Sequence, residues 1–222
     1  MSRTRVAVLT VLVSAALMVP AGAASAQRVV IDDGTADVWD WHREAEGGDW
    51  ALTEAGSLAN VDVTSTTVTT TGSAIRVTST YAELKKSGPQ NPGADSWLKL
   101  SGGGGVVLRA WMDGDAPTTL FFTDKTARPG GKIHRAACRG AEVTFDYGAD
   151  TVTSVLPLSC LPGDPDWVKY LGITTAGSPE QDQYGSPLHL YMDNVSKPSG
   201  YDDLANRSCF WECVGWTKVR VG

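Results

Sequence analysis

Apolar and polar residues alternate at every second position over much of the chain from residue 27 onward. Alternation of this kind is typical of strands with one buried face, whereas no long segment shows the 3.6-residue period of a helix. About ten short strands, separated by turns rich in Gly, Pro and Asp, indicate an all-β fold. We predict an antiparallel β-sandwich with jelly-roll or immunoglobulin-like layering.

The segment from Val68 to Val77 predicts a tight hairpin. Gly72-Ser73 fits a two-residue turn, and this turn pairs Val68 with Val77. Val63 has the opposite parity to Val68, so one of the two would face water in a regular strand. We therefore expect a bulge or break within residues 64–66.

A second hairpin is predicted between Cys138 and Cys160. A three-residue loop at Gly148-Ala149-Asp150 pairs Tyr147 with Thr151, and the same register continued outward places the two cysteines opposite each other. A disulfide closing this loop would stabilise the fold by roughly 3 kcal/mol.

The first residues predict an export signal. Arg3 and Arg5 precede an apolar run over residues 6–19, and small residues of a cleavage site follow at 24–26. The run is shorter than the ~20 residues that a spanning helix needs, so we prefer a cleaved signal peptide to a membrane anchor. We expect a secreted, extracellular protein with a signal peptide at 1–26, a β-sandwich domain at 27–195 and a C-terminal tail packed on it at 196–222.

The chain contains four cysteines, which in an exported protein favour two disulfides among three possible pairings. We prefer Cys138–Cys160 and Cys209–Cys213. A zinc site is the rival interpretation, but the spacing of Cys209 and Cys213 does not fit a zinc knuckle and no histidine lies near them in sequence.

The net charge of −6 bears on the partners. Loss of Arg3 and Arg5 with the signal peptide makes the remaining chain more acidic still. Phosphate recognition needs clustered Lys and Arg, which no stretch of the sequence supplies. Nucleic acid and anionic membranes are therefore not expected partners of the mature protein.

Two sets of strand residues are candidates for ligand binding. Alternation places Trp39 and Trp41 on one face of a short strand, where indoles can stack on sugar rings. In a later strand, Arg109, Trp111 and Asp113 share the face opposite an aliphatic one, and their charged groups can bond sugar hydroxyls. Paired Trp residues on strands are, however, more often part of the core.

Two further assignments concern the surroundings of these strands. Residues 85–95 are a loop by composition. In the strand at 188–193, alternation assigns Leu188, Leu190 and Met192 to the buried face and His189, Tyr191 and Asp193 to solvent.

Calcium is the cofactor that the acidic clusters suggest. Asp32, Asp33 and Asp37 lie within six residues beside Gly34, and calcium is bound by carboxylates and loop carbonyls. The spacing does not match the loop of an EF-hand. Acidic turns without a metal are the alternative.

Two stretches resemble a group of uncharacterised small secreted β-sandwich proteins of high-G+C bacteria. The first consists of Asp33-Gly-Thr-Ala-Asp37-Val38 and Asn60-Val-Asp62-Val-Thr-Ser-Thr-Thr-Val68, and the second of Cys138-Arg-Gly140, Asp150-Thr-Val152 and Pro157-Leu-Ser-Cys160-Leu161 before Trp167-Val168. Ile31-Asp-Asp-Gly34 with Asp37 and Trp39 is also similar to the opening of family 9 carbohydrate-binding and DOMON-like sandwiches, although this chain has an extra Asp there. The second similarity suggests sugar binding.

No set of residues in the sequence assembles into a known catalytic motif. The candidate general bases are His42, His134 and His189. The sequence contains no nucleophile elbow, no zinc-protease helix motif and no phosphate-binding loop. We therefore expect a non-catalytic secreted module that binds a carbohydrate or another cell-surface ligand. The alternatives are a structural or protein-partner domain and a hydrolase of unrecognised type.

Overall fold

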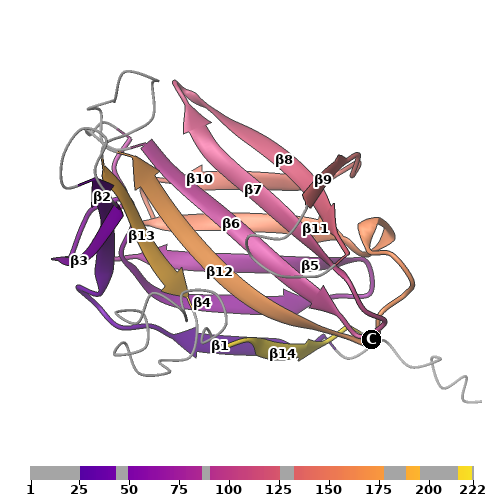
Figure 1. Cartoon of the computed structure of the whole chain (residues 1–222). Coiled ribbons are helices and arrows are strands. Elements are labelled where there is room, and N and C mark those ends of the chain that lie inside the picture. The colour runs from indigo at the N-terminus through magenta and orange to yellow at the C-terminus, as the bar shows by residue number, and fades with distance from the viewer. Residues whose placement is uncertain are drawn as a thin grey trace, which may run out of the picture.

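The computed structural model describes residues 26–43, 50–86, 91–125, 133–177, 189–195 and 215–221. These residues form two packed antiparallel sheets (Figure 1). The five-stranded sheet consists, in spatial order, of β1 (Arg28–Asp32), β4 (Val63–Thr70), β5 (Ala74–Tyr81), β11 (Thr151–Pro157) and β10 (Glu142–Asp146). The predicted all-β sandwich is confirmed.

The second sheet has nine strands. Its order is β3 (Trp50–Gly56), β2 (Val38–Arg43), β13 (His189–Val195), β12 (Trp167–Gly177), β6 (Asn91–Leu100), β7 (Gly105–Asp113), β8 (Ala116–Asp124) and β9 (Ile133–Ala136), and β14 (Thr217–Arg220) pairs with β12. Figure 1 shows its strands crossing those of the smaller sheet at an angle.

The main core lies between the two sheets. Val68 and Ile75 from the smaller sheet and Leu108 and Val168 from the larger one are at most 1% exposed. The larger sheet also packs apolar residues on its outer face, where Val107 and Leu171 are fully buried in a separate cluster. Consequently β7 and β12 carry apolar side chains on both faces, which hides the two-residue alternation in their sequences.

The hairpin formed by β4 and β5 confirms the prediction made for it. Val68 pairs with Val77, and the register shifts between Val63 and Ser65, within the segment where the parity of the valines required a break. The shift lets Val63 and Val68 both reach the core, where each is 0% exposed.

The hairpin formed by β10 and β11 departs from its predicted register by one residue. Asp146, not Tyr147, pairs with Thr151. The turn is longer because Asp146 Oδ1 accepts hydrogen bonds from the backbone amides of Gly148 and Ala149, at 2.9 and 3.1 Å. A side chain that bonds the turn in this way competes with the strand ladder.

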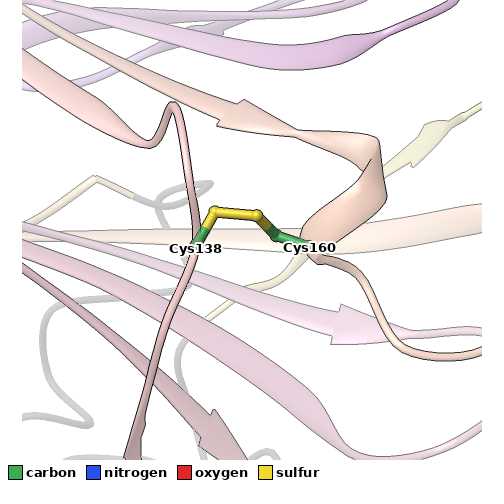
Figure 2. The surroundings of a disulfide bond; sticks show 2 residues. All are labelled: Cys138 and Cys160. Atoms are coloured by element: carbon green, nitrogen blue, oxygen red, sulfur yellow. A yellow bond between two sulfur atoms is a disulfide. The ribbon is translucent and has the colours of Figure 1, made fainter.

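The disulfide between Cys138 and Cys160 is confirmed, with the two Cα atoms 5.5 Å apart. Figure 2 shows it joining the segment before β10 to the short 3-10 helix η1 (Leu158–Cys160), where the chain has already left the hairpin. Cys209 and Cys213 lie outside the described residues, as do the proposed signal peptide up to residue 25 and most of the tail.

Two of the sequence assignments are wrong. Residues 91–95 belong to β6 rather than to a loop, and Asp95 is paired with Arg109. On β13, Asp193 is fully buried instead of facing solvent, and Met192 on the opposite face is buried as well. Among the described residues, no helix has the length and hydropathy needed to cross a membrane.

Candidate functional site

Four aspartates from separate parts of the chain converge beside the start of β4. Asp33 follows β1, Asp37 precedes β2, and Asp193 lies on β13. One carboxylate oxygen from each of these three lies within 4.8 Å of the others. Asp62, next to the first residue of β4, is the fourth member, since its charge acts on both Asp33 and Asp193.

In three of these carboxylates, one oxygen accepts a backbone hydrogen bond and the other has no hydrogen-bond partner. Asp33, Asp62 and Asp193 each accept a hydrogen bond from a backbone amide, at 3.1, 3.0 and 2.8 Å from the nitrogens of Gly34, Ala36 and Val63 respectively. The second oxygens, Asp33 Oδ2, Asp62 Oδ1 and Asp193 Oδ1, are buried without a hydrogen-bond partner. One oxygen of each residue therefore fixes the carboxylate and leaves the other available.

Burial and mutual repulsion determine how these groups titrate. Burial, followed by the charge of Asp37, raises the pKa of Asp33 from 3.8 to about 8, and the hydrogen bond from Gly34 offsets only part of this. Burial is also the largest cause of the raised pKa of Asp193, with smaller contributions from its acidic neighbours. Without a cation, the cluster therefore retains protons at neutral pH.

The predicted calcium ligands are partly corrected by this arrangement. The structure brings Asp33 and Asp37 together, but Asp32 is exposed because Ile31 beside it faces the core and strand side chains alternate. Sequence reasoning did not select Asp62 or Asp193 as ligands. Asp193 was assigned to solvent, whereas the isolated Asp62 between two valines was the available signal of a buried carboxylate.

Gly34 contributes to the cluster through its size. A Cβ atom at this position would lie 2.7 Å from Asp37 Oδ2 and 3.2 Å from Asp37 Cγ. The absence of a side chain therefore lets the Asp37 carboxylate pack directly against the backbone.

A second polar cluster lies on β2 and β13. His189 Nδ1 is 2.8 Å from Asp40 Oδ2, and His42 Nδ1 is 3.2 Å from the same oxygen, although outside hydrogen-bonding geometry. The two imidazoles stack with their centroids 5.3 Å apart. His189 therefore contacts Asp40 across the strands rather than Asp193 on its own strand. Two imidazoles and a carboxylate are ligand types of zinc and copper, and one ligand atom from each of these three residues lies within 4.8 Å of the others.

The outer face of the nine-stranded sheet brings the predicted aromatic residues into one cross-strand row. The paired positions run from Trp111 through Gly93, Thr175 and Met192 to Trp39. A Cβ atom on Gly93 would lie 2.8 Å from Thr175 Oγ1, so the threonine hydroxyl occupies the space beside this glycine. Trp111 and Thr175 therefore lie on either side of Gly93 on this face.

An ion pair adjoins that row. Arg109 donates from Nε and Nη2 to the Asp95 carboxylate, at 2.9 and 2.6 Å from its nearest oxygens, and its side chain is 40% exposed. These hydrogen bonds raise the pKa of the Arg109 guanidinium. Asp95, not Asp113, is therefore the acidic partner of Arg109, and Asp113 remains exposed at the end of β7.

The tryptophans on this face differ in burial. Trp39 is only 6% exposed, so its indole is not an open stacking surface. Trp41 and Trp111 are half-buried. Farther along the sheet, Trp167 is also half-buried and is contacted by the ammonium group of Lys218, 4.6 Å from its ring centroid.

Neither a family model, nor a curated protein, nor a solved structure matches the chain.

Proposed function

We propose that the protein is an exported, non-catalytic binding module that takes a carbohydrate on the outer face of its nine-stranded sheet. The observation that carries this proposal is the grouping of the half-buried Trp111 with the Arg109–Asp95 ion pair and the Thr175 hydroxyl. A sugar ring needs an apolar surface to stack on and charged or hydroxyl groups around its rim, and this patch supplies both.

The ion pair with Asp95 orients the Arg109 guanidinium for hydrogen bonding to a sugar hydroxyl. The hydrogen bonds from Nε and Nη2 to Asp95 fix the guanidinium plane, while Nη1 makes no hydrogen bond with the described residues. Trp111 lies two residues away on the same strand face, roughly 7 Å along the strand. A pyranose stacked on the indole would therefore place a hydroxyl within reach of the guanidinium.

The alternative functions receive less support from the described surface. A protein-partner domain would be favoured by a continuous exposed apolar patch, but Val30, at 50%, is the sole large apolar side chain that is exposed among the described residues. A hydrolase would need its acid and base in a pocket. The His42, His189 and Asp40 group is instead engaged in contacts within itself.

The test is affinity electrophoresis of the purified protein in native gels that contain soluble cell-wall or plant polysaccharides, with tryptophan fluorescence as a second readout. We expect at least one glycan to retard the wild type. Trp111→Ala should be retarded less, with an affinity for that glycan at least tenfold lower. Arg109→Met should weaken binding while leaving the melting temperature within a few degrees of the wild type.

Trp167→Ala is the matched control, because it removes a half-buried indole from the same face but from a distant position beside Lys218. This variant should bind as well as the wild type. The proposal fails if no glycan retards the wild type, or if Trp111→Ala binds as well as Trp167→Ala.

A further inference from the structure

We propose that Asp33, Asp37, Asp62 and Asp193 form a calcium site that ties the two sheets of the sandwich together. The site is independent of the proposed glycan surface and uses none of its residues. Its members come from the chain after β1, the approach to β2, the residue before β4, and β13.

The geometry of the buried oxygens is the first support. Asp62 and Asp193 are 0% exposed, and each has one oxygen bound to a backbone amide and one buried oxygen without a partner. Asp33 repeats the pattern, and its ligand oxygen lies within 4.8 Å of those of Asp37 and Asp193. Buried polar atoms are nearly always paired in native proteins, so three such oxygens in one cluster indicate a missing partner.

Charge is the second support. Moving an ionised carboxylate out of water costs several kcal/mol, and close carboxylates also repel one another. Asp33, Asp62 and Asp193 form no ion pair with a described Lys, Arg or His. A bound cation would remove both costs, because it neutralises the carboxylates and occupies the place of the missing partner.

The donor set identifies the cation. All the side-chain donors are carboxylate oxygens, which favour a hard cation over zinc or copper. Calcium accepts six to eight oxygens in irregular geometry, whereas magnesium demands an octahedral shell and keeps most of its waters. Four carboxylates on loops and strand ends suit calcium, and extracellular modules typically bind it with dissociation constants of about 10⁻⁴–10⁻³ M.

A cation here would join the two sheets at one end of the sandwich. Asp33 continues from β1 of the smaller sheet, whereas Asp37 leads into β2 and Asp193 lies on β13 of the larger sheet. Because calcium would bind only the folded state, the melting temperature should rise in proportion to the logarithm of the calcium concentration. The closure of the two sheets at this end therefore becomes calcium-dependent.

The experiment uses the purified protein stripped with EDTA. Equilibrium dialysis against radioactive calcium should give one ion per chain, and about 10 mM calcium should raise the melting temperature by roughly 5 °C or more. Magnesium at the same concentration should give less than half that shift. Asp33→Asn and Asp193→Asn keep an oxygen for the backbone amide but remove a charge, so both should lose the calcium response.

Asp32→Asn is the matched control, since it removes the same charge from the adjacent but exposed residue. It should respond to calcium as the wild type does. In EDTA, Asp33→Asn and Asp193→Asn should melt no lower than the wild type, because they relieve repulsion. Sensitised terbium luminescence of the wild type tests the site without relying on variants.

The calcium site is refuted if the wild type binds no calcium in dialysis or if its melting temperature is the same in EDTA and in calcium. It is equally refuted if magnesium matches calcium, or if Asp193→Asn responds as fully as Asp32→Asn. None of these measurements involves a glycan, so failure of the calcium site and failure of the proposed function are distinguishable.

Discussion

The carboxylate of Asp193 on β13 accepts a hydrogen bond of 2.8 Å from the backbone amide of Val63, the first residue of β4, and so links the two sheets through a buried polar contact. A second contact reinforces it, since Thr174 Oγ1 donates to the carbonyl oxygen of Val61 at 2.6 Å. The segment before β4 is thus held by polar groups of the larger sheet. Its stability should depend on the ionisation of the buried carboxylates around it.

The first prediction concerns pH in the absence of calcium. Burial raises the pKa of Asp33 to about 8 in the folded protein, against 3.8 for an exposed aspartate. Between these values the folded state holds a proton that the unfolded state has released, so the free energy of unfolding falls as the pH rises. One such proton gives a slope of about 1.4 kcal/mol per pH unit, and Asp193 shifts in the same direction.

Urea unfolding in EDTA between about pH 5 and pH 8 measures this slope. We expect the wild type to lose stability over this interval and saturating calcium to remove most of the loss, because the ion binds the ionised carboxylates. Asp33→Asn should show a shallower decline in EDTA than the wild type. Stability that increased with pH in EDTA would contradict the proposed protonation of the cluster.

The second prediction concerns the disulfide. Cys138→Ala opens a loop with a sequence separation of 22 residues, and the chain-entropy relation gives a cost of roughly 3 kcal/mol for a loop of this length. Urea unfolding of the oxidised wild type and the variant measures the difference. The double variant Cys138→Ala/Cys160→Ala is the control, since it removes the same bridge without leaving a free thiol, and it should unfold near the midpoint of the single variant. A cost below about 1 kcal/mol would mean that the hairpin and η1 are held by their packing.

Local rules were sufficient for much of the fold. The turn at Gly72-Ser73 depends only on neighbouring residues, and the pairing of Val68 with Val77 followed from it correctly. The register after Asp146 was wrong by one residue because its side chain bonds two amides of the turn, an interaction that residue spacing does not reveal.

The candidate site was less accessible to sequence reasoning. Alternation on β13 distinguishes two faces but not which of them is buried, and Met192 and Asp193 are both buried. Asp193 meets Val63, which is 130 positions away, so only the tertiary structure reveals this partner. Asp33 and Asp37 were found because they lie close together in sequence, and the same proximity wrongly added Asp32.

The third prediction concerns Gly172 in β12. A Cβ atom there would lie 2.3 Å from the hydroxyl oxygen of Tyr170 and 3.0 Å from Cβ of Val195, both of which are buried. Gly172→Ala should therefore destabilise the protein by about 1–3 kcal/mol, the usual cost of overpacking. Urea unfolding measures it.

Tyr170→Phe serves as the control for that explanation, because it removes the hydroxyl that the new methyl group would meet. The double variant should lose less stability than the sum of the two single variants, with a coupling of about 1 kcal/mol. Strict additivity would show that the clash with Tyr170 is not the cause.

The last prediction separates two roles of Asn60. This residue is 2% exposed and takes a positive φ of 70°, which is unfavourable for most side chains. Its Oδ1 accepts a hydrogen bond of 2.6 Å from the backbone amide of Lys85, and its own amide donates to the carbonyl oxygen of Glu83 at 2.9 Å. Asn60 therefore joins the segment before β4 to the chain that leaves β5.

Two substitutions distinguish the side-chain bond from the backbone conformation. Asn60→Gly keeps the conformation and loses the bond to Lys85, which should cost about 1–2 kcal/mol. Asn60→Ala loses the bond and also has a Cβ atom in a left-handed conformation, which adds about 1–2 kcal/mol. Urea unfolding in saturating calcium should therefore rank the wild type first, the Gly variant second and the Ala variant last. If the Ala variant proved as stable as the Gly variant, the positive φ would not constrain this position, and the hydrogen bond from the backbone amide to Glu83, which both variants retain, would hold the turn by itself.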